Sequence, residues 1–155
     1  MGYNTLKREC MSQFKEIQPG DEIKEVIKAA FDTDMDVQGE WGYTKELATI
    51  IKNSEGIKQM EHTLAMMRAY IEMNMTLEKE ERYGSINLNE TNREEQDGFH
   101  KVTYEISAMK EDEYAGFIDE YKEGHSKPEF DISDHFKRRK EATLVREVTH
   151  WFKLV

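Results

Sequence analysis

The sequence contains only one cysteine, Cys10, and two prolines among its 155 residues. A single cysteine cannot form an internal disulfide, and it excludes the cysteine-based zinc motifs. Charged residues interrupt every hydrophobic segment, so no stretch reaches the roughly 20 apolar residues of a membrane-spanning helix. The chain also opens without a charged and then apolar leader. We therefore expect a soluble cytoplasmic protein that has no membrane association.

Positive charge is scarce compared with negative charge. Lysine and arginine together number 22, whereas aspartate and glutamate number 32, which gives a formal net charge of -10. A field of this sign repels nucleic-acid phosphates and favours basic protein partners or cations. A short basic run, Lys137-Arg138-Arg139-Lys140, needs an acidic counterpart, either within the fold or as an external anion. Direct binding to nucleic acid is therefore not expected.

Apolar residues recur at helical spacing along the first third of the chain. A first helix would end at Pro19-Gly20, and its apolar face would comprise Leu6, Cys10, Phe14 and Ile17. A second helix follows the cap residue Asp21 and extends to Phe31. A third begins at Thr44 and directs toward the core Leu47, Ile50 and Ile51. The sequence thus predicts three helices before residue 54.

The segment 54–83 is predicted as one long central helix. Apolar residues repeat there at intervals of three and four, and Gly84 supplies a stop; the main face comprises Ile57, Met60, Leu64, Met67 and Ile71. A second stripe on a neighbouring face indicates apolar contacts on two sides; it comprises Met66, Tyr70, Met73 and Leu77. Methionines can line an adaptable binding groove, but we interpret these methionines as core residues.

The apolar period changes to two beyond Gly84. This alternation predicts two strands, at about residues 85–89 and 99–109, which form a small antiparallel hairpin. The polar stretch Glu90–Gly98 would be their long connecting loop. A lone hairpin leaves two open edges, so it needs a third strand, a covering helix or a second subunit. A homodimer is one expected solution.

The pattern near the C-terminus is mixed. A short helix is predicted around Tyr114–Tyr121, ending near Gly124. Residues 142–155 fit a helix face well, yet their β-branched and aromatic residues also favour a strand. We take a helix, because a strand would place Arg146 and His150 on the face of apolar neighbours.

These patterns together predict a mainly α (α+β) fold in a single domain, residues 1–155. The predicted architecture is a helical bundle around the central helix 54–83, with the antiparallel β-hairpin at its side. No internal repeat or low-complexity tract divides the chain.

Three aspartates alternate directly after the second predicted helix. Carboxylates at alternate positions can turn toward one hard cation when the backbone curls. With a predicted helix on each side, the segment Ile27–Ile51 resembles an EF-hand, although Val37 stands where that motif has glycine. The resemblance implies a calcium site whose ligands would be Asp32, Asp34 and Asp36, together with Glu40 or Glu46.

No catalytic constellation is evident elsewhere. The five histidines are scattered, and the pair Glu147 and His150 has the spacing of a di-iron helix but no second copy. A phosphate-binding P-loop motif is absent from the sequence. An enzymatic function and a cofactor other than calcium are therefore not favoured.

The preferred interpretation is a small acidic interaction protein that binds a protein partner stoichiometrically, as an inhibitor, an adaptor or an immunity-type protein. Acidic loops would steer a basic partner, and exposed aromatic residues would supply contact energy. The candidate contact residues are Asp32, Asp34, Asp36, Trp41, Glu94, Glu95 and Asp97. The alternative is a calcium-binding protein that uses the EF-hand-like loop Asp32–Glu46.

Overall fold

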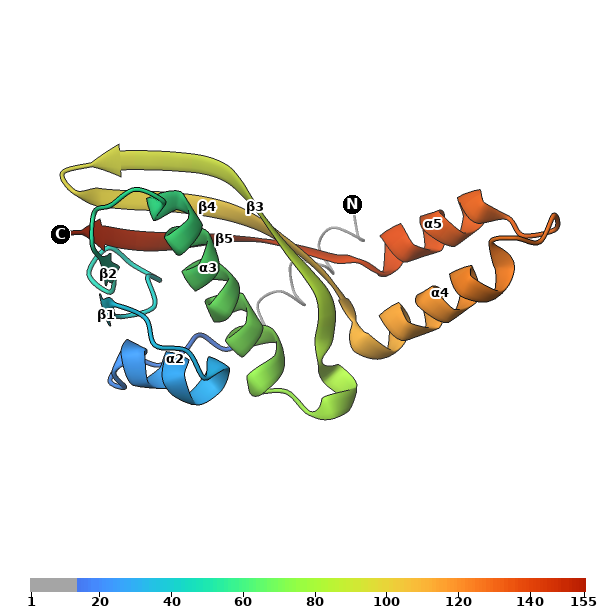
Figure 1. Ribbon diagram of the computed structural model, residues 1–155, viewed down its shortest axis with the longest axis horizontal. Coiled ribbons are helices and arrows are strands. Elements are labelled where there is room, and N and C mark those ends of the chain that lie inside the picture. The colour runs from blue at the N-terminus through green and yellow to red at the C-terminus, as the bar shows by residue number, and fades with distance from the viewer. Residues whose placement is uncertain (1–13) are drawn as a thin grey trace.

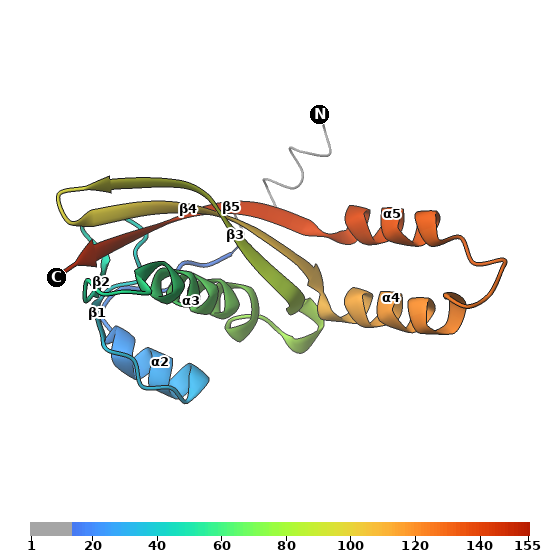
Figure 2. The same cartoon turned by 45° about the horizontal axis from the view of Figure 1, so that its top comes forward.

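The computed structural model describes residues 14–155, which form a five-stranded mixed sheet with helices on one face and two further helices projecting from one end (Figures 1 and 2). The strands are β1 (Val37–Gly39), β2 (Thr49–Ile51), β3 (Tyr83–Gln96), β4 (Phe99–Lys110) and β5 (Leu144–Leu154). The helices are α2 (Ile23–Phe31), α3 (Ile57–Tyr70), α4 (Glu111–Gly124) and α5 (Ile132–Ala142). The strand order is β1-β2-β5-β4-β3, with β2 and β5 parallel and the other pairs antiparallel.

The prediction of a mainly α bundle around a helix at 54–83 is wrong, because the fold is α+β and is built on this sheet. Helix α3 ends at Tyr70, a π-helical turn continues from Ile71 to Met75, and a 3-10 turn spans Lys79–Glu81. Asn74 Oδ1 then accepts a hydrogen bond of 2.6 Å from the backbone N–H of Tyr83, where β3 begins. Gly84 therefore lies inside a strand and does not end a helix.

The hairpin of β3 and β4 is much longer than the sequence predicts. Strands do lie at 85–89 and 99–109, but β3 continues through Gln96, so the predicted loop Glu90–Gly98 is wrong. The connection is the two-residue turn Asp97-Gly98, in which both residues have positive φ, 54° and 79°. An Asp-Gly pair adopts this conformation readily, and the resulting turn matches the twist of the two strands.

The C-terminal segment forms a strand, so the prediction of a helix at 142–155 is wrong. Strand β5 pairs with β4 along one edge and with β2 along the other. It supplies the third strand that the predicted hairpin needed, and α3 covers one face of the sheet (Figure 2). The open edges that motivated a homodimer are thus partly closed within the chain, and the homodimer stays a prediction.

Of the three helices predicted before residue 54, one is present, one is replaced by a strand and one lies largely outside the described residues. Helix α2 matches the prediction, with Ile23 and Ile27 fully buried. The predicted third helix is wrong, because Thr49–Ile51 forms strand β2 instead. The predicted first helix, including Leu6 and Cys10, lies largely outside the described residues, and its described end, 14–17, is not helical.

A core of apolar side chains lies between the sheet and helices α2 and α3; its fully buried members include Ile27, Leu64, Met73, Tyr104 and Phe152. Within residues 14–155, no helix is long and apolar enough to cross a membrane. Helix α4 follows β4 directly, and α5 leads into β5. These two helices form a hairpin that extends beyond the sheet (Figure 1), which we call the helical arm.

Candidate functional site

An apolar groove of about 560 Å³ lies along helix α3. Its walls come from the end of α2, the outer side of α3, the start of β3 and the start of α4. We call it the α3 groove, and it is lined by Phe31, His62, Thr63, Met66, Met67, Tyr70, Asn74, Tyr83, Gly84, Ser85, Ile86 and Glu111. A concave apolar site of this size can bury a small ligand or the anchor side chains of a protein partner.

Methionine and aromatic side chains form the apolar wall of the groove. Met66 and Met67 are partly buried, whereas Met73, one turn and a half further along, is fully buried in the core. Tyr70 is 43% exposed and makes an edge-on ring contact with Phe31 at 5.7 Å. Met73 belongs to the core, as predicted, and Met66 and Met67 pack against the core and also line the groove.

Most polar groups in the groove are already hydrogen-bonded. His62 Nε2 donates to the carbonyl of Leu88 at 3.1 Å, and Thr63 Oγ1 donates to the carbonyl of Gln59 at 2.9 Å. The side-chain oxygen of Asn74 accepts the bond from β3 described above. The carboxylate of Glu111 differs, because it has no hydrogen bond or ion pair with any residue in 14–155. Within the described part of the chain, no cation neutralises this negative charge in the groove.

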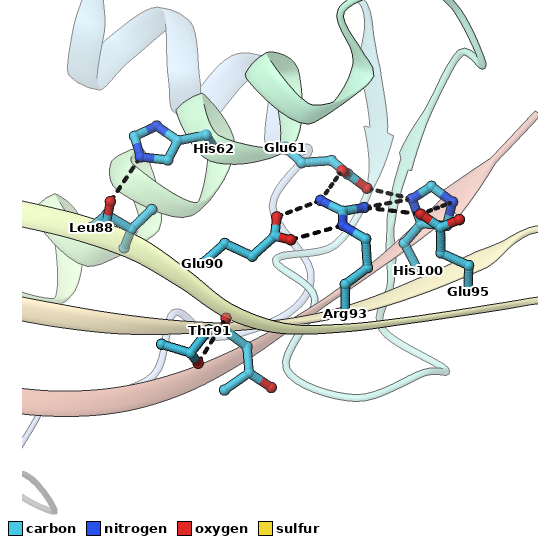
Figure 3. A network of polar contacts seen from close by, with 9 residues as sticks. Glu61, His62, Leu88, Glu90, Thr91, Arg93, Glu95 and His100 are labelled. Atoms are coloured by element: carbon cyan, nitrogen blue, oxygen red, sulfur yellow. Dashed lines mark hydrogen bonds and ion pairs between the residues drawn. The ribbon is translucent and has the colours of Figure 1, made fainter.

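A buried ionic network fixes the first turns of α3 to the β3–β4 hairpin (Figure 3). Glu61 is fully buried, with Oε1 2.9 Å from Arg93 Nη2 and Oε2 2.8 Å from His100 Nδ1. Arg93 also pairs with Glu90 at 2.7 Å. The hydrogen bonds that Arg93 donates to Glu90 and Glu61 raise the pKa of Arg93, and the bond accepted from Arg93 lowers the pKa of Glu90. These contacts connect the helix to the hairpin through charge.

A second network fixes the other end of α3. Glu72, 2% exposed, accepts hydrogen bonds from Arg146 at 2.9 Å and from the Tyr43 hydroxyl at 2.5 Å. Arg68 lies 3.7 Å from the same carboxylate and donates to the carbonyls of Trp41 and Thr149. Burial, with Glu72 nearby, raises the pKa of Tyr43, and burial lowers the pKa of Arg68. The α3 wall of the groove is therefore held at both ends.

The three aspartates predicted as metal ligands pair with lysines, and Asp32 and Asp34 share one of them. Asp32 and Asp34 lie 3.4 and 3.6 Å from Lys28 Nζ, and Asp36 lies 3.2 Å from Lys52 Nζ. Over residues 14–155, no group of three or more potential ligand side chains is gathered. The exit helix that the EF-hand resemblance requires does not form, because Thr49–Ile51 belong to strand β2, and β1 lies within the predicted loop.

Glu40 and Glu46 lie beyond β1, in the connection between β1 and β2, at partly buried and exposed positions. Calcium binding at Asp32–Glu46 stays a prediction. Melting temperatures of the wild type and of Asp32→Ala, with and without calcium, would test it.

The other predicted contact residues are not gathered with the aspartates. Glu94, Glu95 and Asp97 are exposed at the tip of the β3–β4 hairpin, where Glu94 lies 3.8 Å from Lys101. Trp41 is only 2% exposed and belongs to the core, so it does not contribute to the surface.

Sequence reasoning missed the groove, because its walls come from four separate elements. The available signal was the second apolar stripe of the 54–83 segment, since Met66 and Tyr70 from that stripe line the groove. No comparable signal singled out Glu111.

A scan against protein-family models, a search of curated proteins and a search of solved structures each found no match for this chain.

Proposed function

We propose that this protein binds a protein partner stoichiometrically, and that the α3 groove receives a partner segment with an apolar anchor side chain next to a lysine or arginine. The observation that carries the proposal is the methionine and aromatic wall of the groove beside the unneutralised carboxylate of Glu111. An inhibitor, an adaptor or an immunity-type protein would use such a surface.

The apolar wall suits an anchor of variable shape. Methionine side chains are flexible and polarizable, so Met66 and Met67 can adjust to an inserted side chain. The exposed ring of Tyr70 offers a large apolar contact at little cost in side-chain entropy. Buried anchors of this kind supply most of the binding energy in protein interfaces.

Charge favours a basic segment. Glu111 lines the groove at the start of α4, and Asp112 and Glu113 continue the acidic first turn of that helix outside the groove lining. The whole chain has a net charge of -10, which attracts basic partners and accelerates their association. The exposed acidic residues at Asp32–Asp36 and Glu94–Asp97 would add to this steering. A nucleic acid would be repelled by the same field.

A selection from a displayed random-peptide library tests the proposal without knowledge of the natural partner. We expect the selected peptides to combine an aliphatic or aromatic residue with an adjacent lysine or arginine. Fluorescence anisotropy with synthetic peptides then gives the dissociation constant for each variant. Glu111→Lys should raise that constant at least about tenfold, because it replaces attraction with repulsion inside the groove.

The matched control is Glu113→Lys, which makes the same charge change two residues away on the same helix but outside the groove lining. It should change the dissociation constant much less than Glu111→Lys. Equal effects of the two variants would mean that only net charge matters. Enrichment of acidic peptides would contradict the proposed occupant.

A further inference from the structure

A second cavity, of about 300 Å³, lies between the helical arm and the sheet. The side chains of β3 alternate, so Ile86 lines the α3 groove and its neighbour Asn87 lines this cavity. The main lining residues are Asn87, Ser107, Tyr114, Phe136, Arg139 and Lys140, with Ser85 and Thr143 at the edges. We call it the arm cavity.

The charged residues that line the arm cavity are both cations, although the chain is strongly acidic overall. Arg139 and Lys140 have no ion pair with a carboxylate anywhere in residues 14–155. Their neighbour Arg138 differs, because it pairs with Asp134 at 2.9 Å and with Glu120. Among the described residues, the basic run of α5 is therefore neutralised at Arg138 and has no carboxylate partner where it meets the cavity.

Neutral hydrogen-bonding groups surround these two cations. The hydroxyls of Ser85 and Ser107 have no hydrogen bond with residues 14–155, and Asn87 Nδ2 donates only to the carbonyl of Ser85 at 3.3 Å. Ser85 has a φ of 51°, and the β3–β4 register shifts between Gly84 and Asn87. Such bulges redirect side chains and are frequent beside binding sites, and left-handed backbone at a non-glycine residue is strained.

Aromatic rings form the remaining wall. The Arg139 guanidinium lies over the ring of Phe136, 5.4 Å from its centroid, and Tyr114 lines the cavity from α4. A lone phosphate would leave most of 300 Å³ unfilled, and cavities of this size accept small organic molecules. An apolar or flat body against Phe136 would occupy the rest.

We propose that the arm cavity binds a small phosphate ester, with the phosphate held by Arg139, Lys140 and the hydroxyls and the organic body against Phe136 and Tyr114. A guanidinium fork, an ammonium and hydroxyl donors match the several oxygens of a phosphate better than the two of a carboxylate. The acidic residues elsewhere oppose entry only weakly, because charges beyond about 8 Å are screened at physiological salt. The arm cavity shares only Ser85 with the lining of the α3 groove.

Isothermal titration calorimetry in phosphate-free buffer tests the site with four probes: inorganic phosphate, ribose 5-phosphate, adenosine 5′-monophosphate and adenosine. We expect at least one of the two esters to bind the wild type with a dissociation constant below about 1 mM. Adenosine, which lacks the phosphate, should bind at least about tenfold more weakly than its monophosphate. Arg139→Gln should weaken ester binding at least about tenfold.

Lys137→Gln is the matched control, because it removes the same charge from the same helix outside the cavity lining. It should change ester affinity less than about twofold. If Arg139→Gln lowers the melting temperature of the free protein, Ser107→Ala tests the same site from β4 and should weaken binding about threefold.

Three results would overturn the proposal: no ester binds the wild type, Arg139→Gln or Ser107→Ala binds as tightly as the wild type, or adenosine binds as tightly as its monophosphate. Equal affinity for inorganic phosphate and both esters would refute the role given to the aromatic wall. None of these results would affect the peptide binding expected at the α3 groove.

Discussion

Two polar side chains of β5 face the core, and each has a specific partner there. Arg146 donates to the buried carboxylate of Glu72. His150 is fully buried, and its Nε2 lies 2.8 Å from Thr49 Oγ1. The Thr49 hydroxyl gives its single proton to the carbonyl of Glu40 at 2.6 Å, so it must accept from His150. Nε2 of the imidazole therefore carries a proton, and burial favours the neutral form of the ring.

The buried carboxylate of Glu72 should be important for stability. Glu72→Gln would leave Arg68 and Arg146, both largely buried, without their shared counter-charge. Breaking a buried ion pair in this way costs about 3 to 5 kcal/mol, so urea denaturation should show a loss of that order. The exposed pair of Asp32 with Lys28 is the control, and Asp32→Asn should leave the unfolding free energy almost unchanged. Equal small losses in both variants would contradict a structural role for the network.

Burial, aided by Arg68, lowers the pKa of His150 well below its usual 6.5. The unfolded chain therefore binds a proton at higher pH than the folded chain does. The stability that depends on neutral His150 is complete above pH 6.5 and is lost as the pH falls below it, by at most about 1.4 kcal/mol per pH unit.

Denaturation at several pH values between 7.5 and 5 would measure this loss, and subtraction of the His150→Gln curve removes the titration of the other groups. A wild type and a variant with parallel pH dependence would refute the assignment to His150.

Two polar residues, Arg146 and His150, explain why the sequence predicts a helix where strand β5 forms. The alternation of residues 144–154 indicates a strand, but that strand places Arg146 and His150 on the buried face. A charged or polar residue is seldom buried without a partner. The partners, Glu72 and Thr49, are 74 and 101 residues away along the chain. Local sequence could not reveal that the buried polar groups would be satisfied.

At the element scale, the turn Asp97-Gly98 sets the register of the longest strand pair. Gly98 has a φ of 79°, which a residue with a Cβ adopts at a cost of about 1 kcal/mol or more. Gly98→Ala should therefore lower the unfolding free energy by about that amount. Gly116→Ala should raise it by about 0.5 to 1 kcal/mol, because Gly116 lies inside α4 with open space around it. Chemical denaturation of both variants should show opposite signs; shifts of the same sign would refute the conformational explanation.

Helices with a clear apolar periodicity could be predicted from the sequence. Helix α2 follows its apolar stripe, although its N-cap is Glu22 and not the predicted Asp21, and α4 follows the pattern around Tyr114–Tyr121. The Asp97-Gly98 pair is a local signal for a tight hairpin. The polar residues at 90–96 nevertheless resemble a loop. They are polar because β3 is an edge strand and exposes most of them to solvent. Strands β1 and β2 span three residues each, too short for a period to be recognised.

At the scale of the whole molecule, the arrangement of the sheet, α3 and the helical arm creates the two sites proposed for binding. The α3 groove combines residues from 31 to 111, and the arm cavity combines residues from 85 to 143. Neither juxtaposition follows from local pattern, because both require the sheet order β1-β2-β5-β4-β3. The acidic composition is evident from the sequence. The expectation drawn from it, that the protein prefers basic partners, does not depend on the fold.

The most direct test of the central claim is NMR of the protein labelled with ¹³C at its methionine methyl groups. Titration with a selected basic, apolar peptide should shift the methyl resonances of Met66 and Met67, which line the α3 groove, and should leave Met109, buried beside the arm cavity, unchanged. Shifts confined to methionines outside the groove, or a saturating peptide that leaves Met66 and Met67 unperturbed, would contradict the groove as the binding surface.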